Sequence, residues 1–261
     1  MAAELRYFWA LLCMSFKSLA AQRSALIVRA CLALVNHCAY FPVWYIIFSL
    51  SPDIMGWTMQ HALFTYGLCI VSLGTVSLIA FGLRTIPEQI DHGEFDAYLT
   101  LPRPVLISAA LSSPKNSGLG EIILGLGLLI FCHIHYGSSL LFLPLLIIIG
   151  CVIFASSVLF FATIGFWIKQ FYGSADEMYF NFNLLANRPA PIFTGALQFI
   201  ALTFVPVSLM ARVSVDYVMT HHLILLVYAV IGAVAYAFIA VSFFHIGLRR
   251  YESGSRFGVR G

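Results

Sequence analysis

Residues 122–168 read IILGLGLLIFCHIHYGSSLLFLPLLIIIGCVIFASSVLFFATIGFWI and contain no Asp, Glu, Lys or Arg. These 47 residues are enough for two bilayer crossings, because one crossing needs about 20 mostly apolar residues. We expect the turn between the two crossings at residues 133–139 (HIHYGSS). The apolar residues run continuously and do not alternate with polar ones, so we expect helices and not a β-barrel.

The rest of the chain contains further uncharged runs of membrane-spanning length. They are residues 30–52, 54–83, 189–211 and 217–248. Only 10% of the residues are charged, whereas a soluble domain has about 25%. We therefore predict an all-α membrane protein that forms one transmembrane domain over residues 1–261. Its six transmembrane helices are expected at about 25–49, 60–82, 119–135, 140–168, 191–211 and 223–247.

The basic residues predict the orientation in the membrane. Thirteen of the 14 Lys and Arg residues fall at the N-terminal end, in the loops 84–118 and 169–188, or in the tail 248–261. Only Arg212 falls on the other side. Basic loops stay in the cytoplasm, so we expect a multi-pass protein with both termini cytoplasmic. The segment 207–222 would form a short helix or a re-entrant hairpin on the outer side.

Residues 3–22 have the pattern of an amphipathic helix. Their apolar residues recur at spacings of three and four, namely Leu5, Phe8, Leu12, Phe16 and Leu19. Arg6 and Lys17 fall well off that stripe, which is typical of a helix lying in the membrane interface. A cytoplasmic helix packed on a partner is the alternative. Arg249 and Arg250, just beyond the last predicted span, are assigned to the same membrane surface.

Several kinds of chemistry are missing from the sequence. It contains no G-x-x-x-x-G-K-[ST] loop for ATP, no H-E-x-x-H and no G-x-S-x-G. The paired histidines at 133/135 and 221/222 would point to different sides of a helix, so no metal site is expected. No acidic or basic residue falls in the middle of a predicted span, where it would mark an ion path. We expect no cofactor in this chain.

The loop at residues 84–104 reads RTIPEQIDHGEFDAYLTLPRP. Thr85 and Glu88 have the spacing of a capping box, which predicts a short helix from Ile86. Gly93 would end that helix, and a second turn would follow over residues 94–99 before the prolines stop it.

The same loop carries an unusual group of acidic and aromatic side chains. The acids are Glu88, Asp91, Glu94 and Asp96. By helical spacing, Glu88 and Asp91 share a face with Phe95 and Tyr98. A second face, containing Ile86, Ile90, Gly93 and Ala97, would pack against the ends of the spans. The acidic–aromatic face predicts a docking site for a soluble partner, with a solvated loop as the alternative.

Several short motifs, taken in order, resemble the bacterial ABC-2 family permeases, which are the membrane subunits of ATP-driven exporters. The motifs are residues 93–96 (GEFD), 101–105 (LPRPV), 119–121 (LGE), 188–193 (RPAPIF), 205–206 (VP) and 247–253 (GLRRYES). The resemblance covers essentially the whole chain. More narrowly, the chain resembles a branch of six-span subunits that are encoded with a separate ATPase. Residues 114–116 depart from the pattern, because a more acidic connection is expected there.

The resemblance implies an ABC-2 (type V exporter-like) fold in the bacterial inner membrane. Residues 3–22 would be the elbow helix, and residues 86–99 would be a coupling helix in a groove of a P-loop ATPase. The contacts with that ATPase would come from Glu88, Asp91, Glu94, Phe95, Asp96 and Tyr98. ATP and Mg²⁺ would be bound by the ATPase. The permease would pair with a second copy or with a related six-span permease.

In similar folds, the export pathway lies at the interface of two permeases near spans one, two and five. Asn36 and His37 in span one need polar partners in lipid, and Thr75 belongs to the small-residue part of span two. With Phe193 and Phe199 of span five, they are the predicted pathway residues. The alternative functions are a secondary transporter or channel, and a membrane-embedded lipid-processing enzyme. The first needs an intramembrane charge or broken helices, the second a catalytic cluster, and the sequence shows neither.

Overall fold

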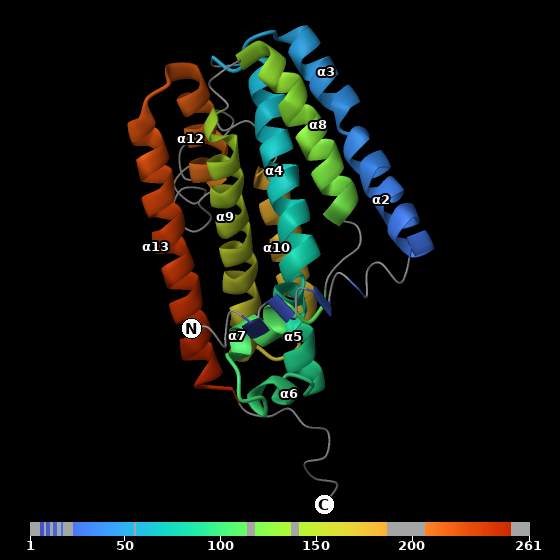
Figure 1. Ribbon diagram of the computed structural model, residues 1–261, viewed down its shortest axis with the longest axis vertical. Helices are drawn as coiled ribbons and strands as arrows, with labels where there is room; N and C mark the ends of the chain where they lie inside the picture. Colours follow the sequence, from blue (N-terminus) through green and yellow to red (C-terminus); the bar gives the residue numbers. More distant parts are fainter. Residues whose placement is uncertain are drawn as a thin grey trace, which may run out of the picture.

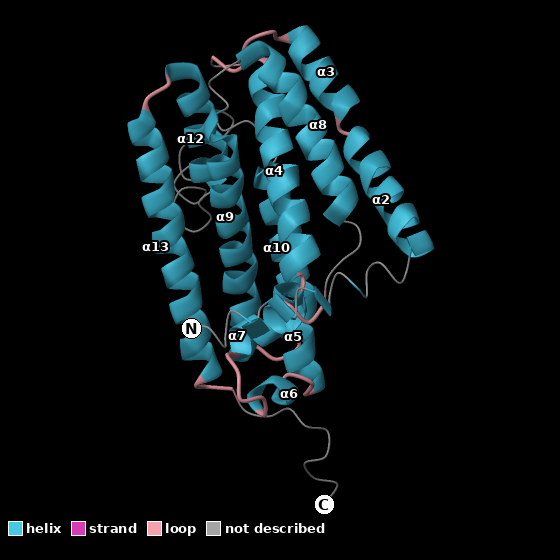
Figure 2. Ribbon diagram, viewed as in Figure 1, coloured by secondary structure: helices cyan, strands magenta, loops and turns pink. Residues whose placement is uncertain are grey.

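The computed structural model describes residues 23–54, 56–113, 118–136, 141–186 and 207–251, together with scattered residues between 6 and 17. In these parts the chain is helical apart from turns and one isolated bridge between Ile54 and Trp57 (Figure 2). The long helices are α2 (Arg23–Cys38), α3 (Phe41–Leu50), α4 (Met59–Ala80), α8 (Gly118–Tyr136), α9 (Leu143–Thr163), α10 (Tyr172–Ala186), α12 (Val207–Thr220) and α13 (Leu223–Leu248). The short ones are α5 (Gly82–His92), α6 (Asp96–Leu99), α7 (Val105–Ala110) and the 3-10 helix η2 (Ile164–Phe166).

The long helices run along a common axis, and α5, α6 and α7 gather at one end of them (Figure 1). The contacts give the order α2, α8, α4, α9, α13 across the bundle. Helix α10 packs on α5, α9 and η2, and α12 packs on α4, α9 and α13. The short helices therefore form a base under the bundle, and this base is where the predicted coupling region lies.

Helix α4 is the centre of the fold because its small residues admit α8 at close range. A Cβ atom on Gly74 would lie 2.7 Å from the carbonyl oxygen of Gly118, and one on Gly125 would lie 2.8 Å from that of Gly67. Such close approach lets two helices pack well in lipid, where no hydrophobic effect drives them together. The apolar window of α4 is 83% buried, so this helix is enclosed by the others.

Within the described residues, four helical segments are long and apolar enough to cross a membrane. They are Arg23–Leu50, Met59–Ala80, Leu143–Phe166 and Leu223–Leu248. They match four of the expected spans, and this finding supports a multi-pass membrane protein. The third expected span is present as α8, whose apolar part, Gly118–Cys132, is shorter. Residues 191–206 of the expected fifth span lie outside the described residues, so the count of six remains a prediction.

Helix α10 corrects the expectation of a loop at residues 169–188. Its Phe182 is 2% exposed and packs edge-on against the rings of Phe154 and Phe161 in α9. The loop was expected because charged residues interrupt the uncharged runs at residues 169–188. Asp176 is in fact paired with Arg84, 92 residues earlier in the chain.

The region 84–118 also contains more helix than expected. Helix α5 begins at Gly82 and not at Ile86, because only Phe81 separates it from α4 and no free helix end needs a cap. The Thr85 hydroxyl donates to the carbonyl of Gly82 and makes no capping box. Helix α7 follows Pro104 directly, and it was not predicted. The segment 207–222 contains α12, as the short-helix alternative predicts.

Candidate functional site

A cleft of about 320 Å³ opens between α2, α4, α8 and α10 at the junction of α4 with α5. It is lined by Asn36, His37, Tyr40, Leu73, Ser77, Arg84, Glu121, Tyr179, Phe180 and Asn183. Most of these side chains are polar, although the surrounding helices are apolar. Polar groups are costly inside a membrane and mark functional paths, so this cleft is the first candidate site.

The α2 side of the cleft is held by Tyr66 of α4. Helix α2 ends at Cys38, and the carbonyl of His37 accepts the N–H of Tyr40 at 3.2 Å in the turn that follows. The Tyr66 hydroxyl donates to this carbonyl at 3.3 Å and lies 3.1 Å from His37 Nδ1. Tyr66 is 1% exposed, and its ring also contacts the rings of Tyr40 and Phe41. The break between α2 and α3 is thus fixed against α4.

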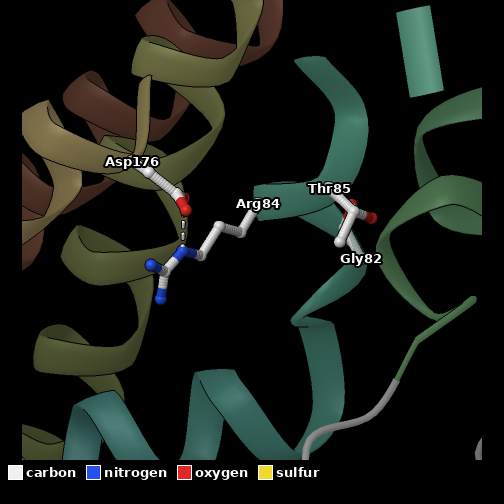
Figure 3. A network of polar contacts seen from close by, with 4 residues as sticks. All are labelled: Gly82, Arg84, Thr85 and Asp176. Atoms are coloured by element: carbon white, nitrogen blue, oxygen red, sulfur yellow. Dashed lines mark hydrogen bonds and ion pairs between the residues drawn. The ribbon is translucent and has the colours of Figure 1, made fainter. Parts of the chain in front are cut away.

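The α10 side of the cleft is held by Arg84 of α5 (Figure 3). Arg84 Nε donates to Asp176 Oδ1 at 2.7 Å, and Arg84 Cζ lies 4.4 Å from the centre of the Tyr179 ring. Thr85, the next residue, points away from Asp176 and bonds within its own helix. One side chain therefore ties α5 to two residues of α10 while it lines the cleft.

At the base of the bundle, the turn between α5 and α6 has the geometry of a Schellman motif. Gly93 adopts φ 74°, the left-handed conformation that glycine takes most easily. The N–H of Glu94 donates to the carbonyl of Gln89 at 2.8 Å, and the N–H of Gly93 donates to that of Ile90 at 3.2 Å. The Gln89 amide also donates to the Tyr98 hydroxyl at 3.2 Å. Helix α6 is therefore folded back onto α5.

A family model described as ABC-2 family transporter protein matches residues 34–255. The chain belongs to the ABC-2 transporter family. The match includes both the cleft and the α5–α6 turn. No curated protein and no solved structure matches the chain.

The chain is thus the membrane-spanning permease subunit of an ABC transporter, and this family associates with ABC ATPases. Permeases of the family are generally non-catalytic. Family membership favours this interpretation over a secondary transporter or a lipid-processing enzyme.

Of the predicted pathway residues, the permease places Asn36 and His37 in the cleft. Thr75 is not brought to them. Its hydroxyl donates to the carbonyl of Val71 in the same helix, and it does not line the cleft. Phe193 and Phe199 lie outside the described residues.

Sequence reasoning missed the α10 side of the cleft because α10 was interpreted as a loop. Two residues could have indicated this contact. Arg84 follows the predicted span two and Asp176 precedes the predicted span five, so both fall near the same predicted membrane edge.

Of the predicted coupling residues, Phe95 requires a correction. It is fully buried, with ring centres 5.7 Å from Tyr98, 5.5 Å from Phe166 and 5.3 Å from Tyr251. The prediction that Phe95 shares an exposed face with Glu88 and Asp91 is therefore wrong. The left-handed Gly93 breaks the helical phase, so the 100° count cannot be carried across it. For the same reason Ala97, expected to pack inward, is exposed.

The remaining coupling residues form a partly exposed acidic end. Glu94 is exposed, and Glu88, Asp91, Asp96 and Tyr98 are half-buried. Asp91 Oδ1 accepts the backbone N–H of Gln170 at 2.8 Å, so this acid fixes the backbone between η2 and α10 against α5. Exposed apolar side chains continue the surface at Leu99 and Leu101. The part of the permease that is free for a partner is thus centred on Glu94.

The predicted membrane-surface residues are all exposed. Arg6 and Lys17 belong to described helical positions, and Arg249 and Arg250 follow α13. The N-terminal segment also touches the base, because the Tyr7 hydroxyl lies 3.0 Å from the Ser108 hydroxyl of α7. Arg103 Cζ lies 5.0 Å from the centre of the Tyr7 ring.

Proposed function

We propose that the permease forms one half of the export pathway of an ABC exporter and is driven by a separate P-loop ATPase. The observation that carries the proposal is the polar cleft, whose α10 wall is joined to α5 by Arg84. Arg84 thereby connects the cleft, through which the substrate would move, to α5, which would reach the ATPase. ATP and Mg²⁺ would be bound on the ATPase, and both termini would be cytoplasmic in the bacterial inner membrane.

The exposed surface of α2 supports a second permease next to the cleft. No residue of α2 is buried, and only 6% of the apolar window of Arg23–Leu50 is buried inside the chain. The polar Asn36 is exposed between apolar residues such as Leu32 and Val35. Lipid is a poor neighbour for an amide. A second copy, or a related permease, would close the cleft and give Asn36 a polar surrounding.

The base of the bundle supports coupling through α5 and α6. The exposed Glu94 would meet basic side chains of an ATPase groove, which sets the register of docking more than its affinity. Movement of α6 would be passed to α5 because the Gln89–Tyr98 hydrogen bond and the Gly93 turn join them. Arg84 would then displace α10 through Asp176 and Tyr179, and α4 would respond directly because α5 follows it after one residue.

ATP hydrolysis tests this function. The tagged permease is purified from membranes under mild conditions, and a co-purifying protein is identified by mass spectrometry. We expect a P-loop ATPase that hydrolyses ATP in the complex, whereas the permease alone hydrolyses none because it has no nucleotide-binding loop. Hydrolysis by the permease alone at the rate of the complex would contradict the proposal.

A further inference from the structure

A second polar cavity, of about 450 Å³, lies at the base of the bundle where α5, η2 and the end of α13 meet. Its lining includes Asp91, Trp167, Lys169, Gln170 and Arg250. The cleft described above contains none of these residues. Neither the family match nor the proposed pathway gives this cavity a role.

The cavity lies at the level where a membrane presents its headgroups. Two apolar segments end beside it, Leu143–Phe166 and Leu223–Leu248. Lys169 and Arg250 follow these ends by three and two residues. Trp167 is 36% exposed and stacks on Phe243 of α13 with ring centres 4.8 Å apart. Tryptophan at the end of a span is typical of the membrane–water interface.

The charge of the cavity is positive. Lys169 and Arg250 are exposed, and neither forms an ion pair with any residue in the described ranges. The one acid in the lining is Asp91, whose Oδ1 already accepts the Gln170 N–H at 2.8 Å. Two cations against one engaged carboxylate leave a net attraction for an anion.

The border of the cavity is apolar and exposed. Ile168, between Trp167 and Lys169 in the chain, is 50% exposed, and Ile246 of α13 is 54% exposed. The backbone between η2 and α10 turns at Gln170, which has φ 57° although it is not glycine. Residues held in this conformation cluster at functional sites and need their surroundings to fix them; here Asp91 does so.

We propose that this cavity binds the phosphate group of an anionic phospholipid of the cytoplasmic leaflet. Lys169 and Arg250 contact the phosphate, and the acyl chains lie along the exposed apolar border. Anionic lipids are concentrated in that leaflet, and the positive-inside bias places this end of the bundle there. Because Asp91 belongs to α5, an occupied site holds the coupling region at the membrane surface.

The test is a lipid titration of the full-length permease in a neutral detergent. Dioleoylphosphatidylglycerol is added, and the midpoint of thermal unfolding gives an apparent affinity. Dioleoylphosphatidylcholine is the neutral comparison. Each cation near an anionic lipid contributes about a fivefold gain in affinity. The double variant Lys169→Gln/Arg250→Gln is therefore expected to bind phosphatidylglycerol about 30-fold more weakly.

A matched control removes the same charge from outside the cavity. Arg23→Gln/Arg29→Gln alters two exposed arginines of α2 that do not line it, and its lipid affinity is expected to stay at the wild-type value. If the double variant does not fold, the single variant Lys169→Gln is used in its place. Its affinity for phosphatidylglycerol is expected to fall about fivefold. Lys169→Arg is expected to keep the affinity.

Three results would overturn the proposal. The first is equal stabilisation by phosphatidylcholine, and the second is an unchanged phosphatidylglycerol affinity in the cavity variants. The third is stabilisation by inorganic phosphate or sn-glycerol 3-phosphate as strong as that by the lipid, which would make the ligand a soluble phosphate. If the double variant keeps its lipid affinity but loses the co-purifying ATPase, the cavity is a protein contact.

Discussion

Removing the Arg84 side chain is expected to separate ATP binding from the opening of the cleft. The variant Arg84→Gln keeps a polar side chain of moderate length but loses the ion pair with Asp176 and the stack over Tyr179. Its neighbour Thr85 provides a matched control, because Thr85→Val removes a hydroxyl that bonds only within α5. Both variants are expected to insert into the membrane and to assemble with the ATPase.

The cost to stability is small because the ion pair is partly exposed. The side chain of Arg84 is 26% exposed and that of Asp176 is 43% exposed, so the pair contributes about 0.5–1 kcal/mol. The cation–π contact at 4.4 Å contributes about another 0.5–1 kcal/mol. We therefore expect Arg84→Gln to lower the free energy of unfolding by about 1–2 kcal/mol, which leaves a folded permease.

The assay follows the cleft itself and needs no knowledge of the substrate. Ser77 lines the cleft and is replaced by Cys in a background that lacks the six native cysteines. The rate of thiol labelling is measured in the permease–ATPase complex with and without a non-hydrolysable ATP analogue. We expect the analogue to change the rate in the parent and in Thr85→Val, and to have no effect in Arg84→Gln.

A double-mutant cycle checks the physical reasoning. Arg84→Gln and Asp176→Asn are expected to be non-additive, with an interaction free energy of about 0.5–1 kcal/mol in chemical unfolding. Additive costs, together with a normal response of the Ser77 position in Arg84→Gln, would refute the role of this side chain.

Three further predictions concern packing, topology and coupling. In thermal unfolding, Gly74→Ala should lower the free energy of unfolding by about 1–3 kcal/mol, because its Cβ would lie 2.7 Å from the carbonyl oxygen of Gly118. Gly127→Ala is the control and should be neutral or stabilising, because the space around the new Cβ is open. A cysteine at Ser51 should react with an impermeant thiol reagent on intact cells, and a cysteine at Ser253 should not; the reverse pattern would invert the predicted orientation. Phe95→Ala should cost about 3–5 kcal/mol of unfolding free energy, because the ring is fully buried, while Glu94→Lys should leave stability within about 0.5 kcal/mol and weaken co-purification of the ATPase. Stable Phe95→Ala with lost ATPase binding would mean that its ring meets the partner after all.

The spans could be predicted because each depends on a local property. An uncharged run of membrane-spanning length needs no partner to be recognised, and α4, α9 and α13 match their runs to within a few residues. Gly93 was predicted to end α5 for a similar reason, since the left-handed turn requires a residue without Cβ.

The features that were missed depend on contacts between distant residues. Helix α10 was not predicted because charged residues interrupt the uncharged runs there, and the charge of Asp176 is balanced by Arg84, 92 positions away. Phe95 was assigned to the wrong face because a helical count cannot pass through a left-handed residue. Tyr66 was not noticed as a partner of His37, 29 residues earlier, because neither residue has a distinctive local pattern.

The central claim is that a P-loop ATPase drives this permease from the end of the bundle that carries α5 and α6. The most direct measurement is site-specific photo-crosslinking in native membranes. One photoreactive amino acid is placed at position 94, on the exposed turn. Another is placed at position 51, which follows α3 at the end of the bundle away from α5 and α6. We predict that the adduct at position 94 contains a P-loop ATPase and that position 51 gives no such adduct. An ATPase adduct at position 51, or its absence at position 94 in a complex that hydrolyses ATP, would contradict the claim.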